Sequence, residues 1–314
     1  MKKIKSEIRK DYLFNDYVII TPSRSKRPRD VKPETGVSSN SNNCPFCPKN
    51  LNQKNIIDIV KKGKKDWQAI SIENIFPAVT LNNSRAYGQQ EVIIETPKHD
   101  TQLGELNLKE IKALLNLYQK RTKKIAENKK INYILIFKNQ GAKAGASLKH
   151  SHSQVFATKI IPHELSEEAS LTQDYLIKNR ACPYCDIIKK ELKTPRKIFE
   201  DKHFAVIAPF ASKYHYEAWV LPKRHLDNIS LLTNNELDSL AKCLKLILSK
   251  LKKDNLDYNF FLHNVVPDKN QHFYIKIQPR DSVWAGVELG SGLVINSVSP
   301  EQAAKYYKKN AKKL

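Results

Sequence analysis

The segment INYILIFKNQGAKAGASLKHSHSQVFAT, residues 131–158, contains two strand-like runs joined by a glycine-containing turn. Its second run carries two histidines one residue apart, with a glutamine two residues further on. A predicted helix precedes the segment at residues 107–130, and a strand-like run that ends in a histidine precedes the helix at residues 91–99. The apolar face of the helix is formed by Leu108, Ile111, Leu114, Leu115 and Tyr118. The first half therefore predicts a strand–helix–strand–strand unit.

The second half of the chain repeats this order. A strand-like run at 215–225 is followed by a helical pattern at 233–255, which begins with Thr233 as the expected cap, and by strands at 258–266 and 272–279. The paired histidines are 51 residues apart in the first half and 47 in the second. We predict an internal duplication with a boundary near 165–180, which gives halves at residues 1–170 and 171–314. The expected fold class is α+β, a mainly antiparallel sheet with helices packed on it.

Four of the five cysteines form two Cys-x-x-Cys pairs, one ahead of each unit. In a reducing compartment this spacing favours metal binding over disulfides. Two cysteines and two histidines are a common ligand set for structural zinc, and each half offers that number. We therefore predict two zinc ions per chain; the alternative is that the thiols are ordinary buried residues and the histidines are unrelated. The predicted ligands are Cys44, Cys47, His99 and His150 in the first half, and Cys182, Cys185, His225 and His272 in the second.

The two neighbouring histidines are expected to have different roles. His150 corresponds to the predicted ligand His272, whereas His152 corresponds to Tyr274. On a strand, residues 150, 152 and 154 share a face, so Gln154 would lie beside His152. Imidazole with a pKa near 6.5 is mostly neutral at pH 7 and can attack a phosphorus atom. The pattern indicates one nucleophilic site in the first half and a catalytically degenerate second half; the alternative is a polar strand residue without catalysis.

The charge composition does not favour nucleic-acid binding. The formal net charge is +22, but the excess consists of 44 lysines against 10 arginines, spread over the whole chain. Arginine is the better bidentate ligand for phosphates and bases, so we expect a solvated lysine-rich surface that could attract an anionic small substrate. The apolar run ILIF at 134–137 is far too short to cross a membrane, and no apolar segment follows the basic start. We expect a soluble cytoplasmic protein.

The segment FKNQGAKAGASLKHSHSQVFA, residues 137–157, resembles the active-site segment of galactose-1-phosphate uridylyltransferases. These enzymes are the transferase branch of the histidine-triad superfamily, whose signature is His-x-His-x-Gln. The resemblance runs from residue 18 to about residue 309 and implies a fold of two histidine-triad-like units. It implies that His152 is the nucleophile that takes a nucleoside monophosphate from a nucleotide sugar, and that Gln154 holds the transferred phosphate. The nucleotide and its phosphates would be bound by Arg24, Arg27, Asn74, Phe76, Asn139 and Ser147.

The same resemblance implies substrates and partners. UDP-glucose would transfer UMP to His152, and galactose 1-phosphate would then accept it in a ping-pong reaction. Glu288 matches a position near the sugar hydroxyls that the partner subunit of a homodimer often supplies. Well-known bacterial members carry an iron site in the second half, where this chain has two cysteines and two histidines. That set is similar to a branch with two zinc sites, which includes enzymes acting on ADP-glucose. An ADP-glucose phosphorylase, or another sugar-1-phosphate nucleotidyl transferase, is therefore one alternative, and a non-catalytic zinc-stabilised nucleotide-binding protein is another.

Overall fold

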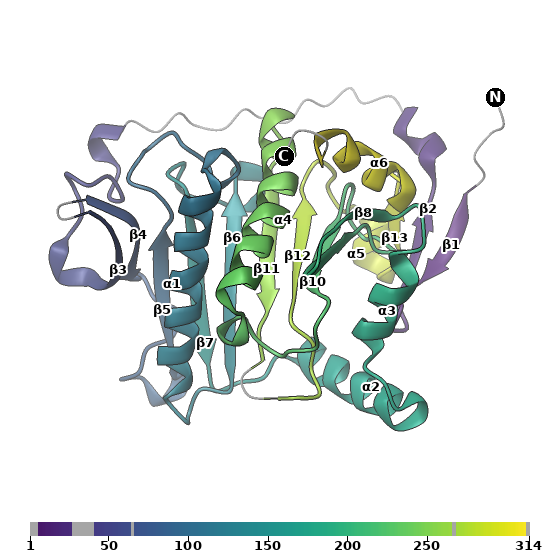
Figure 1. The fold of residues 1–314 in the computed structure, drawn as a ribbon, viewed down its shortest axis with the longest axis horizontal. Coiled ribbons are helices and arrows are strands. Elements are labelled where there is room, and N and C mark those ends of the chain that lie inside the picture. The colour runs from purple at the N-terminus through teal and green to yellow at the C-terminus, as the bar shows by residue number, and fades with distance from the viewer. Residues whose placement is uncertain (1–5, 27–40, 64–65, 266–267, 312–314) are drawn as a thin grey trace.

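A ten-stranded sheet forms the centre of the computed structural model, which describes residues 6–26, 41–63, 66–265 and 268–311 (Figure 1). The strand order is β3-β4-β5-β7-β6-β11-β12-β10-β9-β8, and each recorded pairing is antiparallel. The strands are β3 Ile56–Lys62, β4 Asp66–Glu73, β5 Gly88–Ile94, β6 Tyr133–Gln140, β7 His152–Thr158, β8 Lys197–Glu200, β9 Phe204–Ile207, β10 Ala218–Pro222, β11 Tyr258–His263 and β12 Tyr274–Pro279.

The sheet order confirms the predicted duplication of an α+β unit. The first half contributes β3-β4-β5-β7-β6 and the second contributes β8-β9-β10-β12-β11, which is the same order of elements. The two halves meet where β6 pairs with β11. The division into two domains at residue 170 stays a prediction, because helix α2 (His163–Asn179) crosses it and the sheet is continuous.

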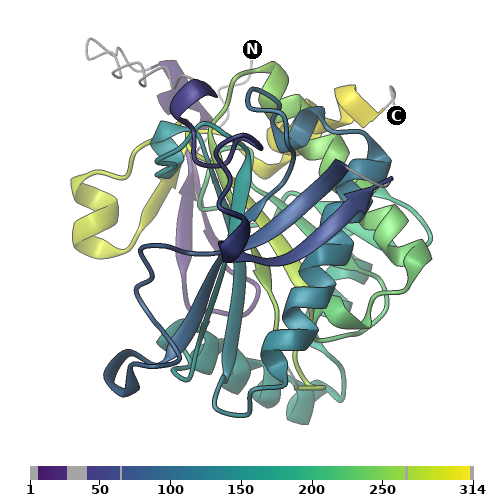
Figure 2. The same cartoon turned by 90° about the vertical axis from the view of Figure 1, so that its left-hand side faces the viewer.

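Two long helices, α1 (Leu108–Ala126) and α4 (Asn234–Lys253), cover one face of this sheet (Figures 1 and 2). Each begins with a capping box, Asn107 with Glu110 and Thr233 with Glu236, so the expected Thr233 cap is confirmed. Alternate residues of the strands point toward the helices and form one hydrophobic core that contains residues from both halves. Cys243 of α4 is fully buried in this core.

The opposite face of the sheet carries two smaller clusters, one in each half. In the first, the segment 44–51 packs on Ile70, Ile72, Val92 and Ile94, whereas the adjacent residues Ala69 and Ile93 face the main core. In the second, α3 (Pro183–Glu191) packs on strands β9 and β10. Both cysteine pairs therefore lie on the face away from α1 and α4.

A second, three-stranded sheet lies beyond β8–β10, at the right of Figure 1. It pairs β1 with β2 antiparallel and β2 with β13 parallel. No helix within the described ranges is long and apolar enough to span a bilayer. The remaining elements are β1 Glu7–Lys10, β2 Tyr17–Ile20, β13 Val294–Asn296, α5 Gly286–Ser291 and α6 Pro300–Ala311, with the short helices η1 Pro22–Lys26, η2 Ser41–Asn43, η3 Gln53–Asn55, η4 Ser84–Ala86, η5 Leu103–Glu105, η6 Ala142–Ala144 and η7 Ile229–Leu231.

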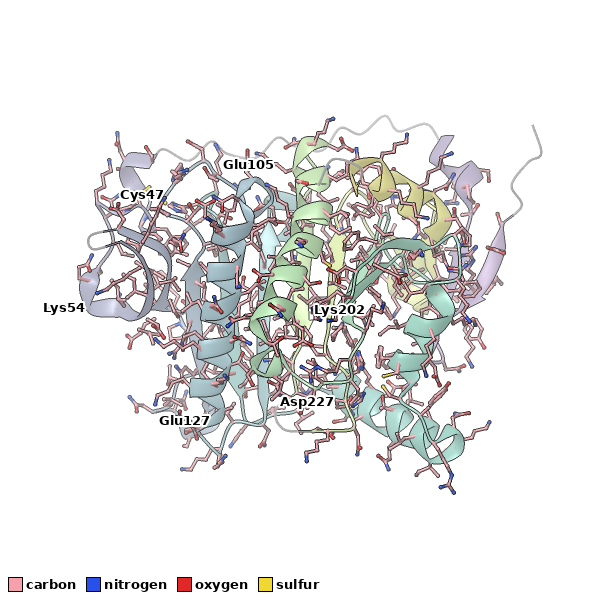
Figure 3. All side chains as sticks on the ribbon, viewed as in Figure 1. Cys47, Lys54, Glu105, Glu127, Lys202 and Asp227 are labelled. Carbon is pink, nitrogen blue, oxygen red and sulfur yellow. The ribbon has the colours of Figure 1, made fainter. Side chains whose placement is uncertain are left out.

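The backbone of η5, in the first half, lies very close to the backbone of α4, in the second half. Glu105, labelled in Figure 3, belongs to η5. A Cβ added at Gly104 would stand 2.4 Å from the carbonyl oxygen of Leu248 in α4. The ammonium of Lys245 also donates hydrogen bonds to the carbonyl oxygens of Gly104 and Leu106. Only glycine allows η5 to lie this close to α4.

Replacing Gly104 with alanine is expected to destabilise the protein, because neither backbone segment can shift without disturbing the shared core. Forcing one extra carbon into such a contact costs about 1–3 kcal/mol. The free energy of unfolding in urea measures this effect. Gly286→Ala is the matched control, since its added Cβ meets nothing within 4 Å. Equal stability of the two variants would contradict the assigned close approach.

Candidate functional site

The first cysteine pair lies against two histidines on the face of the sheet away from α1. Cys44 Sγ lies 3.6 Å from His150 Nδ1, and Cys47 Sγ lies 3.4 Å from His99 Nδ1 and 3.7 Å from His150 Nδ1. Each residue offers one ligand atom, and the four atoms lie within 4.8 Å of one another. The predicted first metal group is thus brought together and could hold one ion.

The second half repeats this arrangement. Cys182 Sγ lies 3.8 Å from His272 Nδ1, and Cys185 Sγ lies 3.7 Å from His225 Nδ1. The Nδ1 atoms of the two histidines are 3.3 Å apart. A hydrogen bond from the Cys185 thiol lowers the pKa of Cys182 to about 3, so this pair readily provides a thiolate.

Both groups fit a tetrahedral metal ion. With Zn–S near 2.3 Å and Zn–N near 2.1 Å, a sulfur and a nitrogen on one zinc stand about 3.6 Å apart. The sulfur–nitrogen distances of 3.4–3.8 Å in the two groups are close to this value. The ring orientations are also those of ligands. Nε2 of His150 lies 2.8 Å from the carbonyl oxygen of Thr96, and Nε2 of His225 lies 2.7 Å from that of Lys269. Because a carbonyl only accepts, these Nε2 atoms carry the proton and Nδ1 keeps the lone pair for a metal.

His152 is held differently from its neighbour His150. It opens strand β7, is 7% exposed, and its ring packs edge-on against Phe46 with the ring centres 5.1 Å apart. Its Nδ1 lies 2.8 Å from the carbonyl oxygen of His150, so Nδ1 donates and Nε2 carries the lone pair. Burial, helped by the positive charge of Lys138, holds the pKa of His152 below its usual value. A neutral imidazole with Nε2 available is the form that acts as a nucleophile.

Two predicted substrate residues lie on the same face of the sheet as His152. Gln154 is two residues further along β7 and is partly exposed. Phe137 of β6 pairs with Gln154, so Asn139, two residues on, falls beside His152 across the two strands. The amide of Asn259 on β11 donates to Asn139 and fixes its side chain. This face therefore presents an imidazole and two amides together.

Three other predicted residues lie in loops of the first half. Asn74 follows β4, and its side-chain oxygen accepts a hydrogen bond from the backbone N–H of Phe76. The ring of Phe76 is 85% exposed, which is unusual for an aromatic residue and leaves it free to stack. Ser147 is exposed in the loop between η6 and β7.

Arg24 and Glu288 lie elsewhere, beside the three-stranded sheet. Arg24 is exposed on η1, just after β2. Backbone hydrogen bonds, helped by the positive charge of Arg24, lower the pKa of Glu288 in α5. The Glu288 carboxylate accepts hydrogen bonds from the N–H groups of Ala285 and Ile295, which fixes it to α5 and β13. In Figure 1 these elements stand at the opposite end of the molecule from β4 and β5. Arg27 falls outside the residues that the structure describes.

The equivalent face of the second half is filled by helix α2. The carboxylate of Glu168 accepts hydrogen bonds from the hydroxyl of Tyr274, at 3.0 Å to each oxygen, and from that of Tyr184. The ring of His263 stacks on Tyr274 with the centres 4.4 Å apart. Tyr274 is thus buried and hydrogen-bonded where the first half has His152, and the catalytic degeneracy of the second half stays a prediction.

Sequence reasoning missed Lys138 and Glu95, which lie beneath His152 on the side of α1. Both are almost fully buried, and their charged atoms are 2.8 Å apart. A signal was present, because Lys138 stands where the alternation of β6, after Ile134 and Ile136, requires an apolar residue facing the core. No sequence pattern indicated that helix α2 packs over Tyr274 and buries it.

Comparisons with known proteins agree with this fold. Residues 1–162 match the family model described as galactose-1-phosphate uridyl transferase, N-terminal domain, and residues 88–313 match a domain of unknown function, DUF4921. The class is that of nucleotidyl transferases and phosphorylases with a histidine-triad-like fold. The chain belongs to the galactose-1-phosphate uridylyltransferase family.

Relatives with two different activities are similar to the chain over nearly its whole length. ADP-glucose phosphorylase from Arabidopsis thaliana is 35% identical over 95% of this chain and 91% of its own. Galactose-1-phosphate uridylyltransferase from Thermotoga maritima is 28% identical over 95% and 96%. A crystal structure of the Arabidopsis ADP-glucose phosphorylase with bound ADP-glucose superimposes with a TM-score of 0.85 at 34% identity, covering 97% of this chain and 99% of that one. A structure of a uridylyltransferase gives 0.76 at 27% identity, with 98% and 99% covered.

Proposed function

We propose that this protein transfers a nucleoside monophosphate from a nucleotide sugar by way of a covalent bond to His152. The observation that carries the proposal is the state of this side chain. Its Nδ1–H is bonded to the His150 carbonyl, and burial keeps it neutral, so Nε2 is oriented as a nucleophile. Gln154 and Asn139 lie on the same face and supply N–H donors for phosphate oxygens.

The proposed reaction has two displacements at the α-phosphorus. Nε2 of His152 attacks, an N–P bond forms, and the P–O bond to the departing sugar 1-phosphate breaks. An oxygen of the acceptor phosphate then attacks the same phosphorus, and the N–P bond breaks. The departing phosphate has a second pKa near 6, so it needs little protonation. Positioned donors such as the Gln154 amide are therefore enough to assist it.

ADP-glucose is the first candidate donor, with inorganic phosphate as the acceptor. The similarity to ADP-glucose phosphorylase in sequence and in fold supports this choice, as does the Cys/Cys/His/His set in the second half. UDP-glucose with galactose 1-phosphate is the second candidate, supported by the uridylyltransferase relatives. The same His152 chemistry serves both reactions.

Zinc is the metal that we propose for the two Cys/His groups. The sulfur–nitrogen separations of 3.4–3.8 Å and the carbonyl partners of the imidazoles support it. Its role here would be structural, because in each half four protein ligands complete a tetrahedron. The first ion would fix His150, whose carbonyl oxygen in turn holds the ring of His152.

A homodimer is the assembly that we propose. Arg24 and Glu288 lie together beside the three-stranded sheet, and not on the face that carries His152. Exposed apolar side chains flank Glu288, namely Val283, Val287 and Leu289. Residues from this end of one chain would then complete the sugar pocket of the other.

The donor is identified by the mass of the covalent intermediate. The protein is incubated separately with ADP-glucose and with UDP-glucose, without acceptor, then quenched and weighed intact. We expect a gain of one adenylyl group from ADP-glucose. A uridylyl adduct alone supports the second candidate, and the absence of an adduct from either sugar nucleotide contradicts the proposed function.

The acceptor is identified by chasing the isolated adduct. Inorganic phosphate is expected to return the chain to its original mass and release ADP. Discharge by galactose 1-phosphate but not by inorganic phosphate would show a transferase instead of a phosphorylase.

A further inference from the structure

We propose that Lys138 is a positioning residue for the nucleophile, acting through the backbone of His152 from the opposite face of the sheet. This inference rests on the proposed function of His152. Lys138 is 1% exposed and donates three hydrogen bonds, to Glu95 Oε2 at 2.8 Å, to Ser151 Oγ at 3.1 Å and to the carbonyl oxygen of His152 at 3.0 Å. Glu95 itself directly follows β5 and is 1% exposed.

The carbonyl of His152 needs a donor that the sheet does not provide. Successive carbonyls of a strand point to opposite neighbours, and that of Ser151 accepts from the N–H of Glu95 on the β5 side. The carbonyl of His152 therefore points toward β6. The recorded pairing of β6 with β7 ends at Phe137 and Gln154, two residues short of His152. The side chain of Lys138 supplies the missing donor from β6.

Two bonds thus fix the nucleophile from its two ends. Lys138 holds the peptide that follows His152, and the carbonyl of His150 holds the ring through Nδ1. Rotation of the peptide would turn the whole residue, because the strand is only beginning here. A displacement of about 1 Å of a reacting group can lower a rate on the order of 10²-fold.

Stability alone does not explain a buried charge pair at this place. Removing two charges from water costs about as much as their attraction returns, and apolar replacements are often neutral or stabilising. Ile134 and Ile136 precede Lys138 on the same side of β6 and are buried in the main hydrophobic core. An apolar side chain at position 138 would therefore have apolar neighbours. The pair is instead explained by the hydrogen bonds that it makes to residues 151 and 152.

The test replaces both charges at once. In Lys138→Met/Glu95→Leu the volumes are similar, no charge is left unpaired, and the carbonyl of His152 loses its donor. We expect folding and metal content like the parent, an unchanged dissociation constant for the nucleotide sugar, and single-turnover adduct formation slower by about 10²-fold. If the first variant does not fold, Lys138→Met/Glu95→Gln replaces it. The amide oxygen of Gln at position 95 can still accept the hydrogen bond from Ser151, so the hydroxyl of Ser151 is not left without a partner.

One control separates positioning from general disturbance. Ser151→Ala removes a neighbouring hydroxyl of the same network but leaves the Lys138–Glu95 ion pair and the bond from Lys138 to the His152 carbonyl in place. It is expected to form the adduct within a few-fold of the parent rate. A folded, metal-loaded double variant that forms the adduct at the parent rate would overturn the inference while the proposed function stands. A parent protein that forms no adduct would overturn the proposed function and the inference together.

Discussion

Replacing His152 with alanine is expected to abolish formation of the nucleotidyl adduct and to lower turnover by at least about 10⁴-fold, the scale seen when a covalent nucleophile is removed. The reason is that Nε2 of His152 is the only protein atom in the proposed reaction that bonds to the phosphorus of the donor. Gln154 and Asn139 would still bind the phosphate but could not form the intermediate. Intact mass after incubation with the nucleotide sugar and steady-state turnover measure the two effects.

The same variant should keep its fold and metal. His152 is not one of the four residues of the Cys/His group, and its Nδ1 bonds to a backbone carbonyl, so metal content is expected to equal that of the parent. His163→Ala is a matched control, because His163 is exposed at the start of α2. An adduct on the His152→Ala variant would show that another side chain is the nucleophile. Loss of metal from it would contradict the division of roles between His150 and His152.

Replacing His150 with alanine is expected to release the first metal ion and to destabilise the fold. A structural zinc site can contribute about 10 kcal/mol of apparent binding free energy, comparable with the stability of a whole domain. The smaller hydrophobic cluster of the first half is formed by segment 44–51 packed on β4 and β5. Cys44 and Cys47 of this segment form no disulfide that would hold it there. Metal content by elemental analysis and urea unfolding measure the loss. We also expect adduct formation to fall, because the carbonyl of residue 150 orients His152.

His272→Ala is the comparison that separates the two metal groups. It should lose the second ion and stability, yet form the adduct at a rate close to that of the parent, since Tyr274 and α2 occupy the equivalent face of the second half. Prolonged chelation of the parent should destabilise it as well. A fully folded, metal-free parent would contradict the proposed structural role of zinc.

The repeat and the metal groups could be predicted because the chemistry constrains local sequence. Strand alternation and helical spacing are short-range patterns, and the order of elements after each cysteine pair recurs in both halves. The ligand sets followed from matching the halves, since Cys44 and His150 are far apart in sequence but occupy the same places as Cys182 and His272. The structure brings both sets together without exception.

The remaining features depend on packing between distant segments, which no local pattern encodes. The position of Arg24 and Glu288 at the three-stranded sheet follows from the parallel pairing of β2 with β13. The burial of Tyr274 depends on where α2 turns after leaving β7. Lys138 could be noticed in the sequence as a charged residue at a core-facing position of β6. Its ion pair with Glu95 and its bond to the His152 carbonyl depend on the three-dimensional arrangement of β5, β6 and β7.

One measurement tests the central claim most directly. The protein is loaded with the nucleotide sugar that gives an adduct, digested under conditions that preserve phosphoramidates, and the modified peptide is sequenced by mass spectrometry. We predict a single nucleotidyl group on His152, which an acceptor phosphate removes when added before digestion. A modification on any other residue, or a chain that turns over substrate with no modified peptide, would contradict the account.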